Sequence, residues 1–158
     1  AASNQPDIAV VQSGPFDLRD HQWPGEETWR RPGDPVYDAN LRNEMVGIVD
    51  LFAAQGIHVA WLSLPPLEAP PGQGPGFPEA YREPDRARRY NEILAEVAAM
   101  RPDAVTVIPL AEWLADTGED QRLRPDGIHF SQDTATEVAE QYLGQALVDL
   151  MVSLQAPR

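Results

Sequence analysis

Residues 124–131 read RPDGIHFS and place an aspartate three positions before a histidine. On a tight loop, this spacing can bring the carboxylate of Asp126 against the imidazole of His129. The carboxylate would then fix the tautomer of the ring and stabilise its protonated form, while the other ring nitrogen acts as a general base. The same letters also fit a simpler interpretation, in which His129 is a polar residue near a helix start and Asp126 is an ordinary loop residue.

The spacing of apolar residues predicts the strands and helices that would position this loop. Short apolar runs rich in β-branched residues predict strands at 7–12, 57–64 and 104–109. Apolar residues at helical spacing predict helices at 38–55, 85–101 and 132–154, with a short helix or turn at 110–116. Ser131 is a suitable N-cap for the last helix. The order predicts a single α/β domain over residues 1–158, with a parallel sheet covered by helices on both faces.

Ligands in open parallel sheets bind beyond the carboxyl ends of the strands. The loops expected at that edge are 13–36, 65–84 and 117–130, and Asp126 and His129 lie in the third of them. The first is long and irregular, which is often a sign of a functional loop. The second is rich in Pro and Gly and is expected to be a surface excursion.

The composition narrows the possible partners and chemistry. The chain has 25 acidic and 12 basic residues and a formal net charge of -13. Such a charge would repel nucleic acid and anionic membrane surfaces, so neither is expected as a partner. The chain has no cysteine, which excludes disulfides, thiolate nucleophiles and Cys-ligated zinc.

The block RPDGIHFS, directly before a long amphipathic helix, resembles the last sequence block of the SGNH (GDSL-like) hydrolases, in which D-x-x-H supplies the catalytic Asp and His. PDIAVVQSGPFD resembles the strand that leads into the third block of that family. HVAWLSLPP resembles a later strand with a Pro-rich exit, and RARRYNEILAEVAAMRPDAVTVIPLAEWL resembles the helix, strand and short helix before the Asp-His block. The closest resemblance is to SGNH domains that accompany bacterial membrane acyltransferases acting on cell-wall or surface polysaccharides.

This resemblance implies a flavodoxin-like three-layer α/β/α fold and a serine esterase or O-acyltransferase that acts on acyl esters, such as acetyl esters, of a glycan or cell-wall polymer. His129 would be the general base and Asp126 the residue that orients it. It also implies an acylated saccharide or small ester as substrate, no metal or organic cofactor, and an extracytoplasmic location, periplasmic or at the cell surface. A membrane acyltransferase domain is a possible partner.

The chain departs from the family at the nucleophile. The family uses the Ser of a G-D-S motif, and no G-D-S occurs in the sequence. In the family this motif precedes the strand that residues 7–12 resemble, so we expect the first strand, the nucleophile loop and a helix to be missing. The serine is then expected outside this chain, and the chain alone is expected to be inactive. The sheet edge left open would favour a homo-oligomer or a partner segment, such as the missing N-terminal one, that completes the sheet.

A second departure concerns the oxyanion hole. The segment GPFD places Phe16 where the family has an Asn whose side chain helps to bind the oxyanion. Phe cannot donate a hydrogen bond, and loss of one oxyanion donor costs roughly 3 kcal/mol of transition-state stabilisation. The backbone amide of Gly14 is still expected to donate, and Asp17 is expected to shape the loop.

Two further function classes fit the residues. The first is a non-catalytic glycan- or partner-binding module that keeps the fold. The second is a hydrolase dependent on Mn, Zn or Fe, whose ligands would come from two loops: Asp17, Asp20, His21, Asp126 and His129.

Several other side chains carry weaker expectations. Ser13 and Ser63 end predicted strands but lack the nucleophile-elbow pattern G-x-S-x-G, so packing or capping roles are expected. Trp23 and Trp29 could either stack on a sugar ring or pin their loop to the core. The remaining candidates are expected to be structural: His58 at the start of a strand, Trp61 and Trp113 in the core, and Arg86, Arg88 and Arg89 on a solvated helix face.

Overall fold

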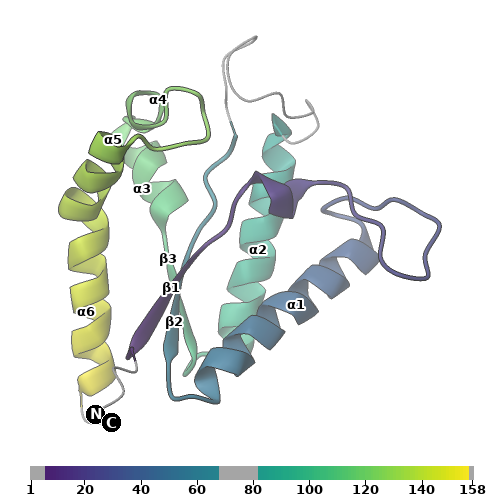
Figure 1. The fold of residues 1–158 in the computed structure, drawn as a ribbon, viewed down its shortest axis with the longest axis horizontal. Helices are drawn as coiled ribbons and strands as arrows, with labels where there is room; N and C mark the ends of the chain where they lie inside the picture. The colour runs from purple at the N-terminus through teal and green to yellow at the C-terminus, as the bar shows by residue number, and fades with distance from the viewer. Residues whose placement is uncertain (1–5, 68–81, 157–158) are drawn as a thin grey trace.

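The structure, a computed structural model, describes residues 6–67 and 82–156. Its elements follow the predicted alternation of strands and helices (Figure 1). In chain order they are β1 (Ile8–Gln12), η1 (Pro15–Leu18), α1 (Pro35–Ala53), β2 (His58–Leu62), α2 (Pro84–Met100), β3 (Val105–Ile108), α3 (Leu110–Thr117), α4 (Asp120–Leu123), α5 (Gln132–Val138), η3 (Ala139–Leu143) and α6 (Gly144–Gln155).

The three strands form one parallel sheet in the order β1-β2-β3. Ala60 of β2 lies at its centre, paired with Val10 on one side and Thr106 on the other. Every residue of β2 is buried, as expected of a central parallel strand with a continuous apolar sequence.

Helices cover both faces of this sheet, so the fold is the predicted three-layer α/β/α arrangement (Figure 1). Successive side chains of β2 point to opposite faces. Val59 and Trp61 enter the core shared with α1 and α2, and Ala60 and Leu62 enter the core shared with α3, α5 and α6. Because the three strands are parallel, their carboxyl ends lie at the same edge of the sheet. The Asp126–His129 loop lies at that edge (Figure 1).

Helix α1 begins at Pro35, three residues before the predicted start. The side chain of Asp34 accepts hydrogen bonds from the amides of Val36, at 2.8 Å, and Tyr37, at 3.4 Å. Pro is favoured at the first helical position because it has no amide hydrogen to satisfy. The prediction was wrong because this cap stands within a Pro- and Gly-rich segment that looks like continuous loop.

The last helix is not the single regular helix that its apolar pattern predicts. Between α5 and α6, the segment η3 is π-helical, and the amide of Gly144 donates to the carbonyl of Ala139 five residues earlier. A Cβ at Gly144 would lie 2.9 Å from that carbonyl oxygen, so glycine relieves the crowding. Ala135 and Ala139 are exposed, although both fit the apolar stripe from which the helix 132–154 is predicted.

Two further expectations from the sequence are wrong. Arg86 lies on α2 but is buried, at 3% exposure, because its guanidinium donates to the carbonyl of Leu18, at 2.9 Å, and to the carboxylate of Asp20, at 2.6 Å. Arg86 thereby fastens the loop after β1 to α2. Trp113 is half-buried rather than fully in the core, and its ring stacks on Tyr142 with centroids 4.9 Å apart. Trp61 is buried as predicted.

The described sheet has two edge strands, β1 and β3, and β1 is the more exposed of the two. Within residues 6–67 and 82–156, β1 is paired with β2 alone, and Val10 in its middle is 50% exposed. Most of the Pro- and Gly-rich excursion predicted at 65–84 lies outside the described residues.

Candidate active site

Asp126 and His129 form the hydrogen-bonded pair that their spacing predicts. One carboxylate oxygen of Asp126, Oδ2, lies 2.7 Å from Nδ1 of His129. The other, Oδ1, accepts hydrogen bonds from the backbone amides of Ile128, at 2.9 Å, and His129, at 2.7 Å. A single carboxylate therefore fixes both the backbone and the ring of the histidine.

The local sequence explains this tight geometry. Gly127 has a φ of 73°, a left-handed conformation that glycine adopts without strain, and its amide donates to the carbonyl of Arg124 at 2.7 Å. Two residues after His129, the side chain of Ser131 accepts from the amide of Thr134 at 3.1 Å and caps α5, as predicted. The loop is thus held between α4 and α5 at the carboxyl ends of the strands (Figure 1).

The charge of Asp126 is stabilised by these contacts. Partial burial raises the pKa of Asp126, but the hydrogen bonds from the amide and ring of His129 and from the amide of Ile128 outweigh it and lower the pKa to about 2. Asp126 is therefore a carboxylate at every pH at which an esterase would be assayed, and it can stabilise a positive charge on the neighbouring ring.

The other ring nitrogen of His129 is available to a substrate or a nucleophile. The side chain of His129 is 63% exposed, and within the described part of the chain its Nε2 has no hydrogen-bond partner. With Nδ1–H directed at Asp126, the neutral ring presents the Nε2 lone pair to solvent. This is the arrangement needed for a general base that takes a proton from a hydroxyl group.

The buried side chain of Arg124 fastens this loop, a role that the sequence does not predict. Its side chain is 2% exposed, and its guanidinium makes a bidentate pair with Asp120, with both N···O distances 2.6 Å. It also donates to the carbonyls of Gly127, at 3.3 Å, and Pro66, at 3.0 Å, which joins the Asp126–His129 loop to the exit of β2. The i, i+4 spacing of Asp120 and Arg124 was the only signal, and that spacing is common on solvated helices.

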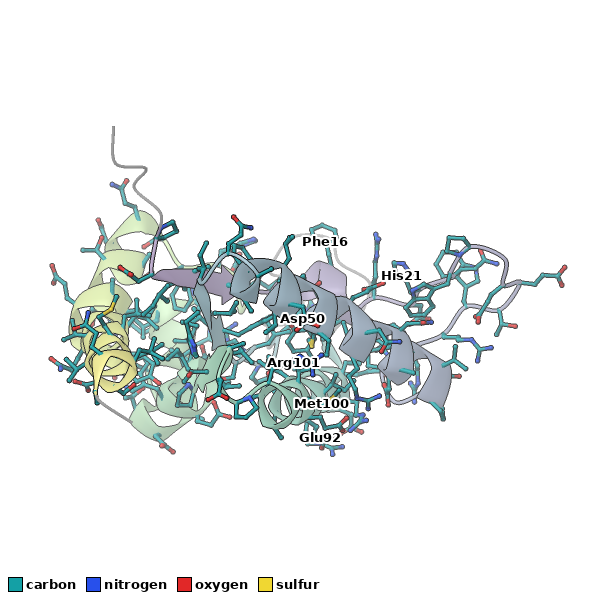
Figure 2. The ribbon with its side chains drawn as sticks, turned by 90° about the horizontal axis from the view of Figure 1, so that it is seen from below. Phe16, His21, Asp50, Glu92, Met100 and Arg101 are labelled. Atoms are coloured by element: carbon teal, nitrogen blue, oxygen red, sulfur yellow. The ribbon has the colours of Figure 1, made fainter. Side chains whose placement is uncertain are left out.

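The candidate oxyanion loop is closed on itself. The amide of Gly14 donates to the carboxylate of Asp17 at 2.9 Å, and the amide of Asp17 donates back to the carbonyl of Gly14 at 3.1 Å. Asp17 shapes the loop, as expected, but it takes up the Gly14 amide that was expected to face an oxyanion. Phe16 is 64% exposed and lies on the outer side of η1 (Figure 2). In the described residues, neither Gly14 nor Asp17 is hydrogen-bonded to Asp126 or His129.

Ser13 and Ser63 have the packed surroundings expected of structural residues. The Ser13 hydroxyl is hydrogen-bonded to that of Tyr90 and accepts from the indole of Trp61 at 3.2 Å. Ser63 is buried, donates to Glu112 at 2.6 Å and accepts from the amide of Ala111 at 2.9 Å. Among the described residues, neither hydroxyl is hydrogen-bonded to His129, so neither is placed as its nucleophile.

The residues of the metal-site alternative are not gathered around one point. Asp17 binds the amide of Gly14, Asp20 binds Arg86, and the ring of His21 lies 4.7 Å from that of Trp23. Within 6–67 and 82–156, no group of three His, Asp or Glu side chains is close enough to hold a metal ion. The described residues therefore do not form the ligand set that the metal-dependent hydrolase would need.

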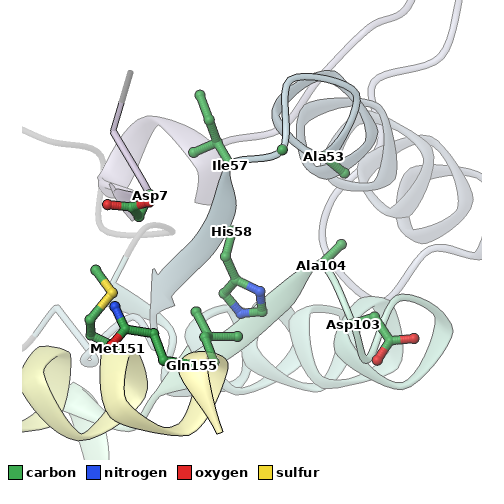
Figure 3. Close-up of a pocket in the computed structure, with 10 residues that line it drawn as sticks. Asp7, Ala53, Ile57, His58, Asp103, Ala104, Met151 and Gln155 are labelled. Atoms are coloured by element: carbon green, nitrogen blue, oxygen red, sulfur yellow. The ribbon is translucent and has the colours of Figure 1, made fainter. Parts of the chain in front are cut away.

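A hollow at the opposite end of the sheet is lined in part by His58 (Figure 3). It lies between the start of β1, the end of α1 and the end of α6, and has a volume of about 330 Å³. His58 borders it, but this ring is 8% exposed, burial lowers its pKa, and its Nε2 lies 2.9 Å from the hydroxyl of Thr106. His58 is therefore a packed structural residue, as predicted.

Comparison of the chain with known protein families and with curated proteins finds no match in either case. None of the helices in the described residues is long and apolar enough to cross a membrane.

Proposed function

We propose that this chain is the acid–base part of an SGNH-type serine esterase or O-acyltransferase, and that a serine outside these residues is its nucleophile. One observation carries the proposal, the Asp126–His129 pair with the Nε2 of His129 open to solvent at the carboxyl edge of a parallel sheet. The parallel three-layer fold and the order of the sequence blocks support it.

In the proposed reaction, Nε2 of His129 takes the proton of the serine hydroxyl as the serine oxygen bonds to the acyl carbon. The resulting imidazolium gives that proton to the leaving alcohol oxygen when the ester C–O bond breaks. Water or an acceptor hydroxyl then attacks the acyl-serine, and His129 again takes the proton and returns it to the serine. Asp126 stabilises the imidazolium in both steps. The acceptor decides between hydrolysis and acyl transfer.

The described residues do not provide the hydrogen-bond donors that the proposed reaction needs to stabilise an oxyanion. The amide of Gly14 is bound to a carboxylate, and Phe16 has no side-chain donor. An oxyanion placed near Asp17 would also be repelled by its charge. We therefore expect the segment that brings the serine to bring oxyanion donors as well.

The open edge of β1 is where we expect that segment to pair. Val10 is 50% exposed while its partner Ala60 in β2 is fully buried, and an added parallel strand would use the backbone groups of β1 that face away from β2. A membrane acyltransferase polypeptide or a second copy of this chain could supply the strand. By the same resemblance, the proposed location is extracytoplasmic and the substrate is an acylated saccharide or a small ester.

A non-catalytic binding module remains the second candidate. The closed Gly14–Asp17 loop and the exposed Phe16 favour it, because within the described residues the Gly14 amide is bound to Asp17 and does not face an oxyanion. The Asp126–His129 pair favours the enzyme, because a binding module does not need a histidine held in one tautomer.

Hydrolysis of p-nitrophenyl acetate separates the two candidates. We expect the complete natural polypeptide that carries this chain, with any subunit that copurifies with it, to hydrolyse the ester. Residues 1–158 alone should give only the buffer rate, because His129 has no serine to activate. Equal turnover by both proteins would contradict a nucleophile outside the chain, and no turnover by the complete polypeptide would favour the binding module.

A further inference from the structure

Two tryptophans on the loop after β1 have opposite environments. Trp23 packs against the core, with its ring 5.3 Å from that of Tyr37 in an edge-to-face arrangement and its Nε1 donating to Glu44 at 3.3 Å. Trp29 is 65% exposed. The sequence left open whether these residues pin the loop or bind a sugar, and the structure assigns pinning to Trp23.

Trp29 is presented on a braced loop. His21 and Arg30 exchange two backbone hydrogen bonds of 2.8 Å, which form a short antiparallel bridge. The side chain of Arg30 is held by Glu26 at 2.7 Å and by Asp34, the cap of α1, at 3.1 Å. These contacts hold both the backbone and the side chain of Arg30. Because Arg30 directly follows Trp29 in the chain, they also restrict the position of the exposed indole.

The indole borders a hollow with polar walls. This hollow has a volume of about 350 Å³ and is lined by Arg19, Asp20, His21, Gln22 and Trp29. A carboxylate oxygen of Asp20 lies 2.6 Å from a guanidinium nitrogen of the buried Arg86, yet the side chain of Asp20 remains 49% exposed. The loop, with His21 near its base, projects beyond the start of α1 (Figure 2). It follows the carboxyl end of β1, the same edge of the sheet that carries His129.

The side chains that line this hollow indicate the chemical class of ligand that fits it. A flat aromatic face accepts the apolar C–H face of a pyranose ring, and the polar side chains around it can donate to and accept from ring hydroxyls. The formal charges of Arg19 and Asp20 cancel, and the chain as a whole carries a net charge of -13, so a polyanion would be repelled. A neutral sugar ring fits both conditions.

We propose that Trp29, with the hollow formed by residues 19–22, is a binding subsite for a neutral pyranose unit of a saccharide. As a substrate subsite it rests on the proposed function, and it names the neutral glycan as the class of substrate. As a binding site it stands on the exposed indole and the polar hollow alone.

The test is an NMR titration of residues 1–158, following the indole N–H of Trp29, with three neutral tetrasaccharides: β-1,4-linked glucose, α-1,4-linked glucose and β-1,4-linked N-acetylglucosamine. A galacturonic acid tetramer is the charged comparison. We expect saturable shifts of Trp29 with at least one neutral tetramer and none with the charged one. Trp29→Ala should weaken that binding by about tenfold or more, and Trp29→Phe should retain most of it.

Leu51→Ala is the matched control, because Leu51 is an apolar residue of α1 with 62% exposure, similar to that of Trp29. It should leave saccharide binding unchanged. The site is overturned if no neutral tetramer shifts Trp29, if only the galacturonic acid tetramer does, or if binding survives Trp29→Ala. Since binding is measured without ester turnover, failure of this site is distinct from failure of the catalytic proposal, which the His129→Ala variant tests.

Discussion

Replacing His129 with alanine should lower kcat/KM for p-nitrophenyl acetate by about 10⁴-fold or more in the complete polypeptide. The reason is that the proposed mechanism uses Nε2 of His129, which is exposed and has no hydrogen-bond partner among the described residues, to take the serine proton, and a neutral serine is a weak nucleophile. The measurement is the initial rate at saturating and subsaturating ester. His129 is exposed, so the variant should keep the circular dichroism spectrum of the parent.

Asp126→Asn should produce a smaller loss, roughly 10²- to 10⁴-fold, because the amide cannot stabilise the imidazolium. Asp133→Asn is the control, since it removes an equal charge from an exposed position four residues after His129 and should leave the rate unchanged. The pKa of Asp126 is about 2, below its ordinary value, so its carboxylate persists on acidification from pH 8 to pH 4. Any loss of activity across that range must arise from another group.

Retention of full activity in His129→Ala would show that the pair does not act in catalysis. The same conclusion would follow if Asp133→Asn were as damaging as Asp126→Asn, because the effect would then be one of general charge.

Replacing Asp120 with alanine should lower the free energy of unfolding by about 3 kcal/mol. Among the described residues, the substitution leaves the guanidinium of Arg124, whose side chain is 2% exposed, with the carbonyls of Gly127 and Pro66 as its remaining partners. A buried charge without its counter-ion is among the largest destabilising changes that a single substitution produces. Urea denaturation followed by circular dichroism measures the effect.

Two variants show whether the buried charge is the cause. Asp85→Ala breaks an ion pair with Arg88 that is open to solvent, with side-chain exposures of 83% and 64%, and should leave the urea midpoint unchanged. The double variant Asp120→Ala, Arg124→Met removes the charge itself and should recover part of the lost stability. If Asp120→Ala behaves like Asp85→Ala, Arg124 is not the strut that the structure indicates.

The strands and the Asp126–His129 pair were predictable because their signals are local. β1, β2 and β3 are apolar runs bounded by polar or turn-forming residues, and no helical pattern competes with them. Asp126 and His129 lie three residues apart, so Gly127 and one turn suffice to join them. The cap at Ser131 is equally local.

The features that the sequence did not predict depend on distant partners. Arg86 is buried because the carbonyl of Leu18 and the carboxylate of Asp20 lie opposite it, and Arg124 because Pro66 does. Charged residues at helical spacing usually face solvent, so nothing local distinguishes these two from Arg88. The capture of the Gly14 amide by Asp17 depends on the turn of η1, which the segment GPFD does not specify on its own.

The most direct test of the central claim is to label the complete polypeptide with a fluorophosphonate and identify the modified serine by mass spectrometry. The proposal predicts one modified serine, outside residues 1–158, whose labelling slows strongly in His129→Ala, and no labelling of residues 1–158 alone. Labelling of Ser13 or Ser63, or labelling at an outside serine that His129→Ala leaves unchanged, would contradict it.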